Sequence, residues 1–247
     1  MRSSCILPAA EKTRSTPPDE NGNVSPAIIY CAKKCGIKYI LKAGGAQAVA
    51  AMAYGTKSCP KVDKVVGPGN QFVTCAKMLI SCDGDAVCSI DMPAGPSEQM
   101  CLFDNSSNLT FVVADLLSQA EHSEDAQVVG VYVNDTTEGT PMREMIEGFS
   151  KELEKQVNAL PRADIVKATL SKSIVVVADS VDEALEYVNG YATEHLVVQT
   201  RDTERIVEGT INAGSIFCGP YAPESVGDYA SGTNHSLPTY GFARQYG

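Results

Sequence analysis

The chain is organised around the segment Leu116-Leu117-Ser118-Gln119-Ala120-Glu121-His122-Ser123. This segment closes an apolar stretch of helical period that starts near Phe111, so we expect a helix from about Thr110 to Glu121. Gln119 and His122 are three residues apart, and on a helix this spacing places both side chains on one face, within reach of one ligand. A metal site is one interpretation of this pair. A polar helix end is the simpler one, because zinc is rarely bound by glutamine.

The composition limits the classes of protein to which the chain can belong. Its 247 residues suffice for one large or two modest domains. The net charge of −10 argues against a nucleic-acid partner, because a phosphate backbone needs a basic face. No apolar run approaches the roughly 20 residues of a membrane span. Nine cysteines without a CxxC pair, together with the lack of a signal peptide, favour reduced thiols and a cytoplasmic location.

Helices and strands alternate in the first part of the chain. Ser25-Pro26 is a helix start, and Gly44-Gly45 opens a second helix. The expected elements here are a helix from Pro26 to Cys35, a strand Ile37–Leu41, a helix Ala46–Tyr54, a strand Val62–Val66 and a helix from about Gln71 to Ile80. This order is typical of a parallel α/β sheet. The first of these units starts on a helix with no strand before it.

The alternation breaks in the proline- and glycine-rich passage from Ile90 to Ser97, which we interpret as a crossing between domains. It then resumes. The expected elements are strands at Glu98–Phe103, Gln127–Val133, Ser173–Ala178, Leu196–Thr200 and Ser215–Cys218, and helices at Thr110–Glu121, Glu138–Asn158, Glu183–Tyr191 and Thr203–Ile211. The tail from Gly219 contains no expected element. The fold class is therefore α/β, with two Rossmann-like parallel-sheet domains, both incomplete.

Two glycine-rich turns join strands to helices, at Gly44-Gly45-Ala46-Gln47 and at Gly67-Pro68-Gly69-Asn70. Such a turn presents backbone N–H groups at a helix N-terminus, which suits a nucleotide phosphate. The dinucleotide fingerprint is not met, because the third glycine position holds Phe72. Each turn alone is equally well explained as a tight helix cap. If both follow strands of one sheet, they line one crevice, and nucleotide binding and simple capping are then about equally favoured.

Acid and base chemistry is most strongly indicated at Glu194-His195, at the start of an apolar strand. Histidine is the natural base for an alcohol near neutral pH, and glutamate can activate water. Neighbours on a regular strand point to opposite faces, so both serve one site only at an irregular strand edge. Asp228 is the best-placed third metal ligand, although a lone loop aspartate is usually a turn residue. His235 is a loop histidine of a kind that is most often solvated.

Several long motifs, taken together, resemble those of the histidinol dehydrogenase family. The resemblance covers the chain from about Thr16 to its end. It is carried by Gly44–Gln47, Lys61–Lys64, Gly67–Val73, Asp91–Glu98, Leu116–His122, Glu194–Leu196 and Gly227–Pro238. It implies a zinc-dependent, NAD-linked enzyme that oxidises L-histidinol through L-histidinaldehyde to L-histidine.

The resemblance also assigns roles to individual residues. By motif match, Gln119, His122 and Asp228 resemble the zinc ligands. Six residues resemble the family's substrate contacts, namely Ser97, Gln119, His122, His195, Asp228 and His235. His195 resembles the base that deprotonates the alcohol, and Glu194 resembles the group that activates water at the aldehyde stage. Gln47 and Asn70 resemble NAD contacts.

The chain also departs from the family pattern. Family members are longer and form homodimers, in which a C-terminal part supplies a fourth zinc ligand, a histidine, and a substrate-binding glutamate to the partner. No histidine follows His235 here. We therefore expect an internal fragment with weak zinc affinity and little turnover by itself. Residues 1–15 form an unmatched segment, residues 16–92 an incomplete nucleotide-binding domain, and residues 93–247 a domain that carries the zinc and substrate residues.

Two other functions are compatible with the sequence. One is a non-catalytic α/β module that retains nucleotide or metal binding, or that only interacts with a full-length copy. The other is a metal-dependent hydrolase, which would act without NAD and which the paired glycine turns disfavour.

Overall fold

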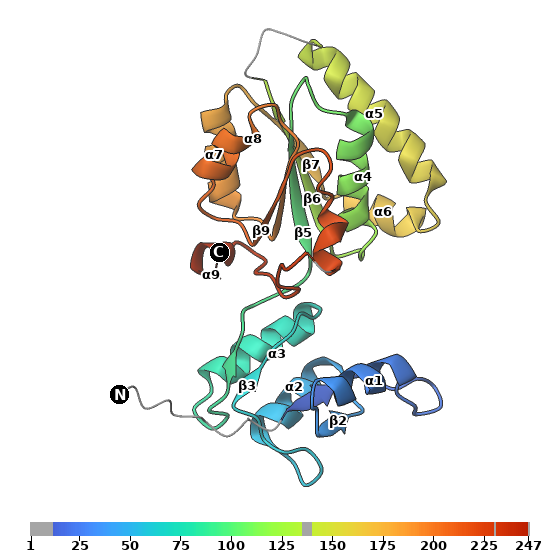
Figure 1. Ribbon diagram of the computed structural model, residues 1–247, viewed down its shortest axis with the longest axis vertical. Helices are drawn as coiled ribbons and strands as arrows, with labels where there is room; N and C mark the ends of the chain where they lie inside the picture. The colour runs from blue at the N-terminus through green and yellow to red at the C-terminus, as the bar shows by residue number, and fades with distance from the viewer. Residues whose placement is uncertain (1–11, 135–139, 230, 247) are drawn as a thin grey trace. The chain divides into compact units, whose positions relative to one another are not determined.

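The computed structural model describes residues 12–134, 140–229 and 231–246 (Figure 1). The chain divides into two compact units between Asp91 and Met92. The expected start of a helix at Glu138 lies outside the described residues, as does most of the segment 1–15. None of the helices within the described ranges is both long and apolar enough to cross a membrane.

The first unit alternates strands and helices, as the sequence predicts. Its elements are β1 (Thr13–Ser15), α1 (Pro26–Lys34), β2 (Tyr39–Leu41), α2 (Gly45–Tyr54), β3 (Lys64–Val65), α3 (Gln71–Cys82) and β4 (Ser89–Ile90). β1 pairs with β2 and β3 with β4, both in parallel. The expectation that no strand precedes the first helix is wrong. The sequence Thr-Arg-Ser of β1 is short and polar, so it carries no strand pattern.

A second correction concerns the sheet of this unit. The alternation of strands and helices predicts one parallel sheet, in which the strands before the two glycine turns would lie together. In the part of the chain that the structure describes, β2 and β3 instead belong to separate two-stranded sheets. Each pair is only two or three residues long, and the apolar contacts of the unit come mainly from α2 packed against α3. Its cluster of buried apolar residues consists of Val49, Ala53, Val65, Ile80, Ala86 and Cys88.

A buried ion pair fixes the second glycine turn of this unit. Lys77, on α3, pairs with Asp91, just after β4, and its Nζ donates to the carbonyl of Gly67 at 2.7 Å. The other oxygen of Asp91 accepts the N–H of Gly67 at 2.8 Å. Gly67 has φ +122, a conformation that favours glycine. The turn is therefore held by both of its peptide hydrogen-bonding groups.

The second unit is a doubly wound parallel sheet. The described strands have the order β7-β6-β5-β8-β9, and every neighbouring pair is parallel. The strands are β5 (Glu98–Phe103), β6 (Gln127–Val133), β7 (Ile174–Ala178), β8 (His195–Val198) and β9 (Ser215–Cys218). The helices are α4 (Leu109–Ala120), α5 (Met142–Ala159), α6 (Ala163–Leu170), α7 (Val181–Tyr191), α8 (Thr203–Gly209), a 3₁₀ helix (Glu224–Asp228) and α9 (Ala243–Tyr246).

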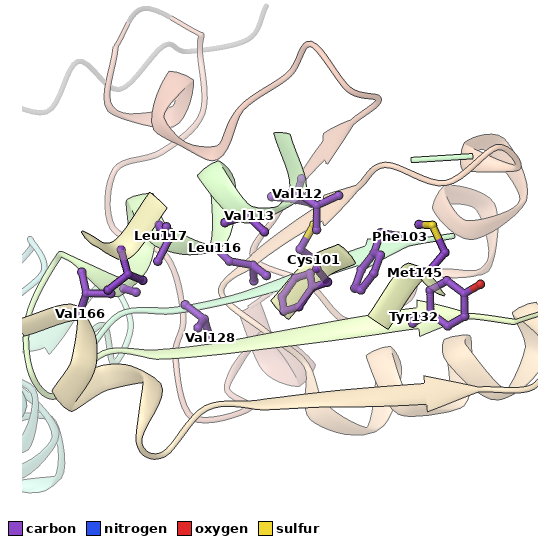
Figure 2. Close-up of a cluster of buried hydrophobic side chains, with 14 of the residues drawn as sticks. Cys101, Phe103, Val112, Val113, Leu116, Leu117, Val128, Tyr132, Met145 and Val166 are labelled. Atoms are coloured by element: carbon purple, nitrogen blue, oxygen red, sulfur yellow. The ribbon is translucent and has the colours of Figure 1, made fainter. Parts of the chain in front are cut away.

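Helices cover both faces of this sheet, with α4, α5 and α6 on one face and α7 and α8 on the other (Figure 1). Alternate residues of β5 enter the two layers, so that Cys101 and Phe103 face α4 while Met100 and Leu102 face α7. Figure 2 shows the first of these cores, in which Phe103 lies beside Tyr132 at a ring-centroid distance of 5.5 Å. β5 is buried along its whole length, which agrees with its apolar run from Met100 to Phe103.

The predicted α/β class with parallel sheets is confirmed. β5, β6 and β9 have the predicted bounds, and α4 starts and ends one residue earlier than expected. α6 was not predicted. The expectation of no element after Gly219 is wrong, because the 3₁₀ helix and α9 lie there. Both are short and polar, and such segments leave little periodic signal.

Candidate active site

The predicted acid/base pair lies at the amino-terminal ends of β5 and β8. His195 is the first residue of β8 and pairs in register with Gln99 of β5. Glu194 comes directly before the strand. The pair is therefore at an irregular strand edge, the condition under which both side chains can serve one site. Ligands of open α/β sheets usually bind at the carboxyl ends of the strands, so this site uses the opposite edge.

Glu194 is held in place by hydrogen bonds to one of its carboxyl oxygens. Its Oε2 accepts the hydroxyl of Ser97 at 2.6 Å and the backbone N–H of Glu98 at 3.0 Å. The backbone is fixed as well, because the Glu194 carbonyl accepts the N–H of Ser215 at 2.9 Å. A Cβ on Gly214 would lie 2.6 Å from that carbonyl oxygen. Glycine at position 214 thus permits the close approach of its backbone to the Glu194 carbonyl, which helps to position Glu194.

The tautomer of His195 follows from its neighbours. Nδ1 lies 3.2 Å from the backbone carbonyl oxygen of Glu98, which can only accept a hydrogen bond. The proton of the neutral ring therefore sits on Nδ1, and Nε2 keeps its lone pair. Nδ1 is also 3.6 Å from Oε2 of Glu194. The arrangement leaves Nε2 as the basic nitrogen.

Burial shifts the titration of this group of side chains. It lowers the pKa of His195 to about 4, so the imidazole is neutral at pH 7 and able to accept a proton. It raises the pKa of Glu194 to about 8, against the hydrogen bonds from Ser97 and Glu98. It also raises the pKa of Glu98 to about 7. A base and an acid with pKa values pushed apart in one pocket are typical of acid–base catalysis.

Two carboxyl groups of this site were not singled out in the sequence. Glu98 is buried beside Glu194, and Glu224, on the 3₁₀ helix, has its Oε1 3.7 Å from Nε2 of His195. Pro223 before Glu224 is a helix-start signal that could have indicated the 3₁₀ helix. Nothing local in the sequence indicates that either carboxyl group is buried, because the burial depends on tertiary contacts.

The predicted zinc ligands are placed as follows. Gln119 is buried in the last turn of α4, and its Nε2 has no hydrogen-bond partner among the described residues. The helix ends before His122, which lies in the following turn. The backbone N–H of His122 donates a hydrogen bond to the Gln119 carbonyl at 3.1 Å. Asp228 ends the 3₁₀ helix, and its Oδ1 is 3.3 Å from Nδ1 of His235.

These residues lie within electrostatic range of the acid/base pair. The Asp228 carboxylate raises the pKa of His195, whereas His122 and His235 lower it, all three effects being smaller than that of burial. In the described ranges, however, no three His, Cys, Asp or Glu side chains form a group that could hold a metal ion. Ser97, through its bond to Glu194, belongs to the same site.

The predicted NAD contacts belong to the first unit. Gln47 is exposed in the first turn of α2, whose N-cap Gly44 forms no side-chain capping bond. Asn70 is the N-cap of α3 and accepts the N–H of Val73 at 3.1 Å. Capping therefore accounts for the side-chain oxygen of Asn70.

The doubly wound sheet and a buried glutamate–histidine pair at its edge define an α/β protein with a candidate acid–base site. The histidinol dehydrogenase family profile matches residues 9–247. The chain belongs to the histidinol dehydrogenase family. The match begins before Thr16, so residues 9–15 are part of it, contrary to the expectation of an unmatched segment 1–15.

The relatives confirm this assignment. "Histidinol dehydrogenase, chloroplastic" of Arabidopsis thaliana is 52% identical over 233 residues, which cover 94% of this chain and 48% of the relative. The histidine biosynthesis trifunctional protein of Saccharomyces cerevisiae is 52% identical over 94% of this chain and 28% of the relative. The crystal structure of histidinol dehydrogenase from Elizabethkingia anophelis matches with a TM-score of 0.84 and 46% identity, over 95% of this chain and 52% of that chain. The chain thus spans about half the length of the plant relative.

Proposed function

We propose that the protein carrying this chain oxidises L-histidinol to L-histidine by way of L-histidinaldehyde, with NAD as the oxidant. The observation that carries the proposal is the neutral His195 with its lone pair on Nε2, next to a buried Glu194 of raised pKa. One residue can take a proton from an alcohol at neutral pH, and its neighbour can take one from water. Relatives that are named histidinol dehydrogenase support the substrate.

His195 takes the proton of the substrate alcohol at Nε2, because Nδ1 is occupied by its bond to the Glu98 carbonyl. Burial keeps the ring neutral and so ready to accept. Glu194 removes a proton from the water that adds to the aldehyde. Its pKa of about 8 leaves a minor ionised fraction at pH 7, and this ionised form is the base. Ser97 orients Glu194 through its hydroxyl group, and its motif match supports the proposal that it contacts the substrate.

Zinc is the metal that the family resemblance implies. Gln119, His122 and Asp228 would hold it, and the buried amide nitrogen of Gln119, which has no hydrogen-bond partner among the described residues, fits a group that is available as a ligand. The oxygen and nitrogen of that amide are interchangeable in assignment, so the unpartnered atom can be the oxygen. When bound, zinc would fix the imidazole and amine of histidinol and so position its alcohol carbon. His235 would contact the substrate beside Asp228.

NAD, when bound, accepts the hydride of each oxidation step. Gln47 and Asn70 would contact it, because both lie at the start of a helix that follows a glycine turn. The uncapped N-terminus of α2 is the better phosphate site of the two, since no side chain takes up its first N–H groups. The Lys77–Asp91 pair keeps the other turn in shape.

The proposal is tested by NADH formation from histidinol in the presence of zinc, with the protein at its native length. Glu194→Gln and His195→Asn should each lower kcat by at least about 100-fold. Glu208→Gln is the matched control, because this exposed glutamate on α8 is not part of the site. Absence of NADH formation by the wild-type protein, with zinc bound, would refute the proposal.

The same experiment separates the alternative functions. Zinc or NAD binding without turnover would favour a non-catalytic module, and substrate hydrolysis without NAD would favour a metal-dependent hydrolase. The 247-residue chain alone should bind zinc weakly, since the three proposed ligands fall short of the roughly four that zinc prefers. A homodimer and a cytoplasmic location are further parts of the proposal. The chloroplastic name of the plant relative makes targeting a point to test.

A further inference from the structure

The two ring nitrogens of His195 face two different carboxyl groups. Glu194 lies on the Nδ1 side, at 3.6 Å, and Glu224 lies on the Nε2 side, at 3.7 Å. The side chains of His195 and Glu224 are each 12% exposed, so the approach is buried. The proposed acid/base roles use Glu194 and leave Glu224 without a function.

Glu224 is built into its position by the surrounding helices. Its Oε2 accepts the hydroxyl of Ser118, on α4, at 3.1 Å. Its backbone N–H donates to Oδ1 of Asp115 at 3.3 Å, and Oδ2 of Asp115 accepts Nε2 of Gln199 at 2.6 Å. These bonds fix one carboxyl oxygen and the main chain of Glu224. The second oxygen, Oε1, is the one that faces the imidazole.

Glu194 and Glu224 face different nitrogens of the imidazole ring, so they cannot take the same role. Its Oε2 already accepts Ser97 and the Glu98 N–H, and it lies beside the nitrogen that carries the proton of the neutral ring. A carboxyl group that stabilises a proton arriving on Nε2 must lie on the other side of the ring. Glu224 is on that side.

We propose that Glu224 is a positioning residue for His195: it orients the ring and accepts the Nε2–H bond once the imidazole has taken the substrate proton. The inference deepens, and rests on, the proposed function. In that step the proton of the alcohol O–H group moves to Nε2, and the hydride on the carbon that bears this hydroxyl group moves to NAD. Glu224 exchanges no atom. A ring movement of about 0.5 Å brings Nε2 and Oε1 within hydrogen-bonding distance.

Other charged groups also face these side chains. Around His195 they are Glu194, Asp228, His122 and His235, and around Glu224 they are Asp115, Asp228 and Glu194. A test must therefore change Glu224 alone and follow His195 directly. Nitrogen-15 NMR of the imidazole does this, because it reports both which nitrogen carries the proton and the pKa of the ring.

The first measurement uses the 247-residue chain with Glu224→Gln. The ring proton should stay on Nδ1 in both proteins, because the Glu98 carbonyl sets it. The nitrogen-15 resonance of Nε2 should shift at pH 8, since the variant lacks the carboxyl oxygen that faces this nitrogen. Glu208→Gln makes the same charge change on exposed α8 and should leave the Nε2 resonance unchanged. If Glu224→Gln does not fold, Glu224→Asp, with a shortened side chain, should shift the Nε2 resonance less.

The second measurement uses the protein at its native length. Glu224→Gln should lower kcat for histidinol about 100-fold while KM stays within about twofold, and Glu224→Asp should recover part of the loss. An Nε2 resonance that does not respond to Glu224→Gln overturns the inference, whether or not the protein is active. A resonance that responds, in a wild-type protein that forms no NADH, upholds the pairing and refutes only the proposed function.

Discussion

Replacing Glu194 by glutamine should stabilise the protein at neutral pH although it removes the proposed water-activating group. The carboxyl of Glu194 has a pKa of about 8 in the folded chain against an ordinary value of 4.5. Between these two pH values the folded chain retains a proton that the unfolded chain has released. The free energy of unfolding therefore decreases as the pH rises through this window.

The magnitude follows from the distance between the two pKa values. Each pH unit in the window is worth about 1.4 kcal/mol, so at pH 7 the buried carboxyl costs about 3 kcal/mol. Glutamine resembles the protonated carboxyl in shape and carries no titratable proton. Its amide oxygen can still accept the hydroxyl of Ser97 and the N–H of Glu98. Glu194→Gln should thus gain about 3 kcal/mol at pH 7 and almost nothing at pH 5.

The assay is urea unfolding at pH 5, 6, 7 and 8, read by hydrogen–deuterium exchange in peptides of β5 and β8. These strands report on the second unit separately from the first. The wild-type protein and Glu208→Gln should lose stability together as the pH rises, and Glu194→Gln should lose less. A difference between Glu194→Gln and the wild type that is the same at every pH would refute the reasoning.

Three further outcomes are expected. His195 has a pKa lowered to about 4, so stability should increase with pH from about 4 to 6.5, and His195→Asn should flatten that increase in acid unfolding curves. Gly214→Ala should cost about 1–3 kcal/mol in thermal unfolding, because the new Cβ would lie 2.6 Å from the Glu194 carbonyl oxygen. Lys77→Met should destabilise the first unit by about 3–5 kcal/mol, since Asp91 loses its buried ion-pair partner, and adding Asp91→Leu should recover part of that loss in the same assay.

The sequence predicts β5 and β6 well because both strands are buried on both faces. They are runs of six and seven residues followed by turn-forming residues, and their bounds agree with the prediction. β1 was missed for the opposite reason: Thr13-Arg14-Ser15 is polar and short. The separation of β2 and β3 into different sheets depends on tertiary packing, which no local pattern contains.

The candidate site was predictable to a different degree for each residue. Glu194-His195 is recognisable from the adjacent acid and imidazole, and its place at a strand edge follows from the apolar residues after it. The tautomer of His195 depends on the carbonyl of Glu98, from a strand about a hundred residues earlier. The position of Glu224 depends on Ser118 and Asp115, on a helix equally far away in sequence. Contacts of this kind are visible only in the folded chain.

The direction of α4 determines what kind of ligand the site attracts. Gln119 lies in the last turn of α4, and His122 follows the helix, so the site faces the carbonyl end of that helix. This end carries a partial negative charge, whereas phosphate groups are drawn to the opposite, amide end. We therefore expect an edge lined by helix carbonyls and carboxylates to favour cations over phosphate groups.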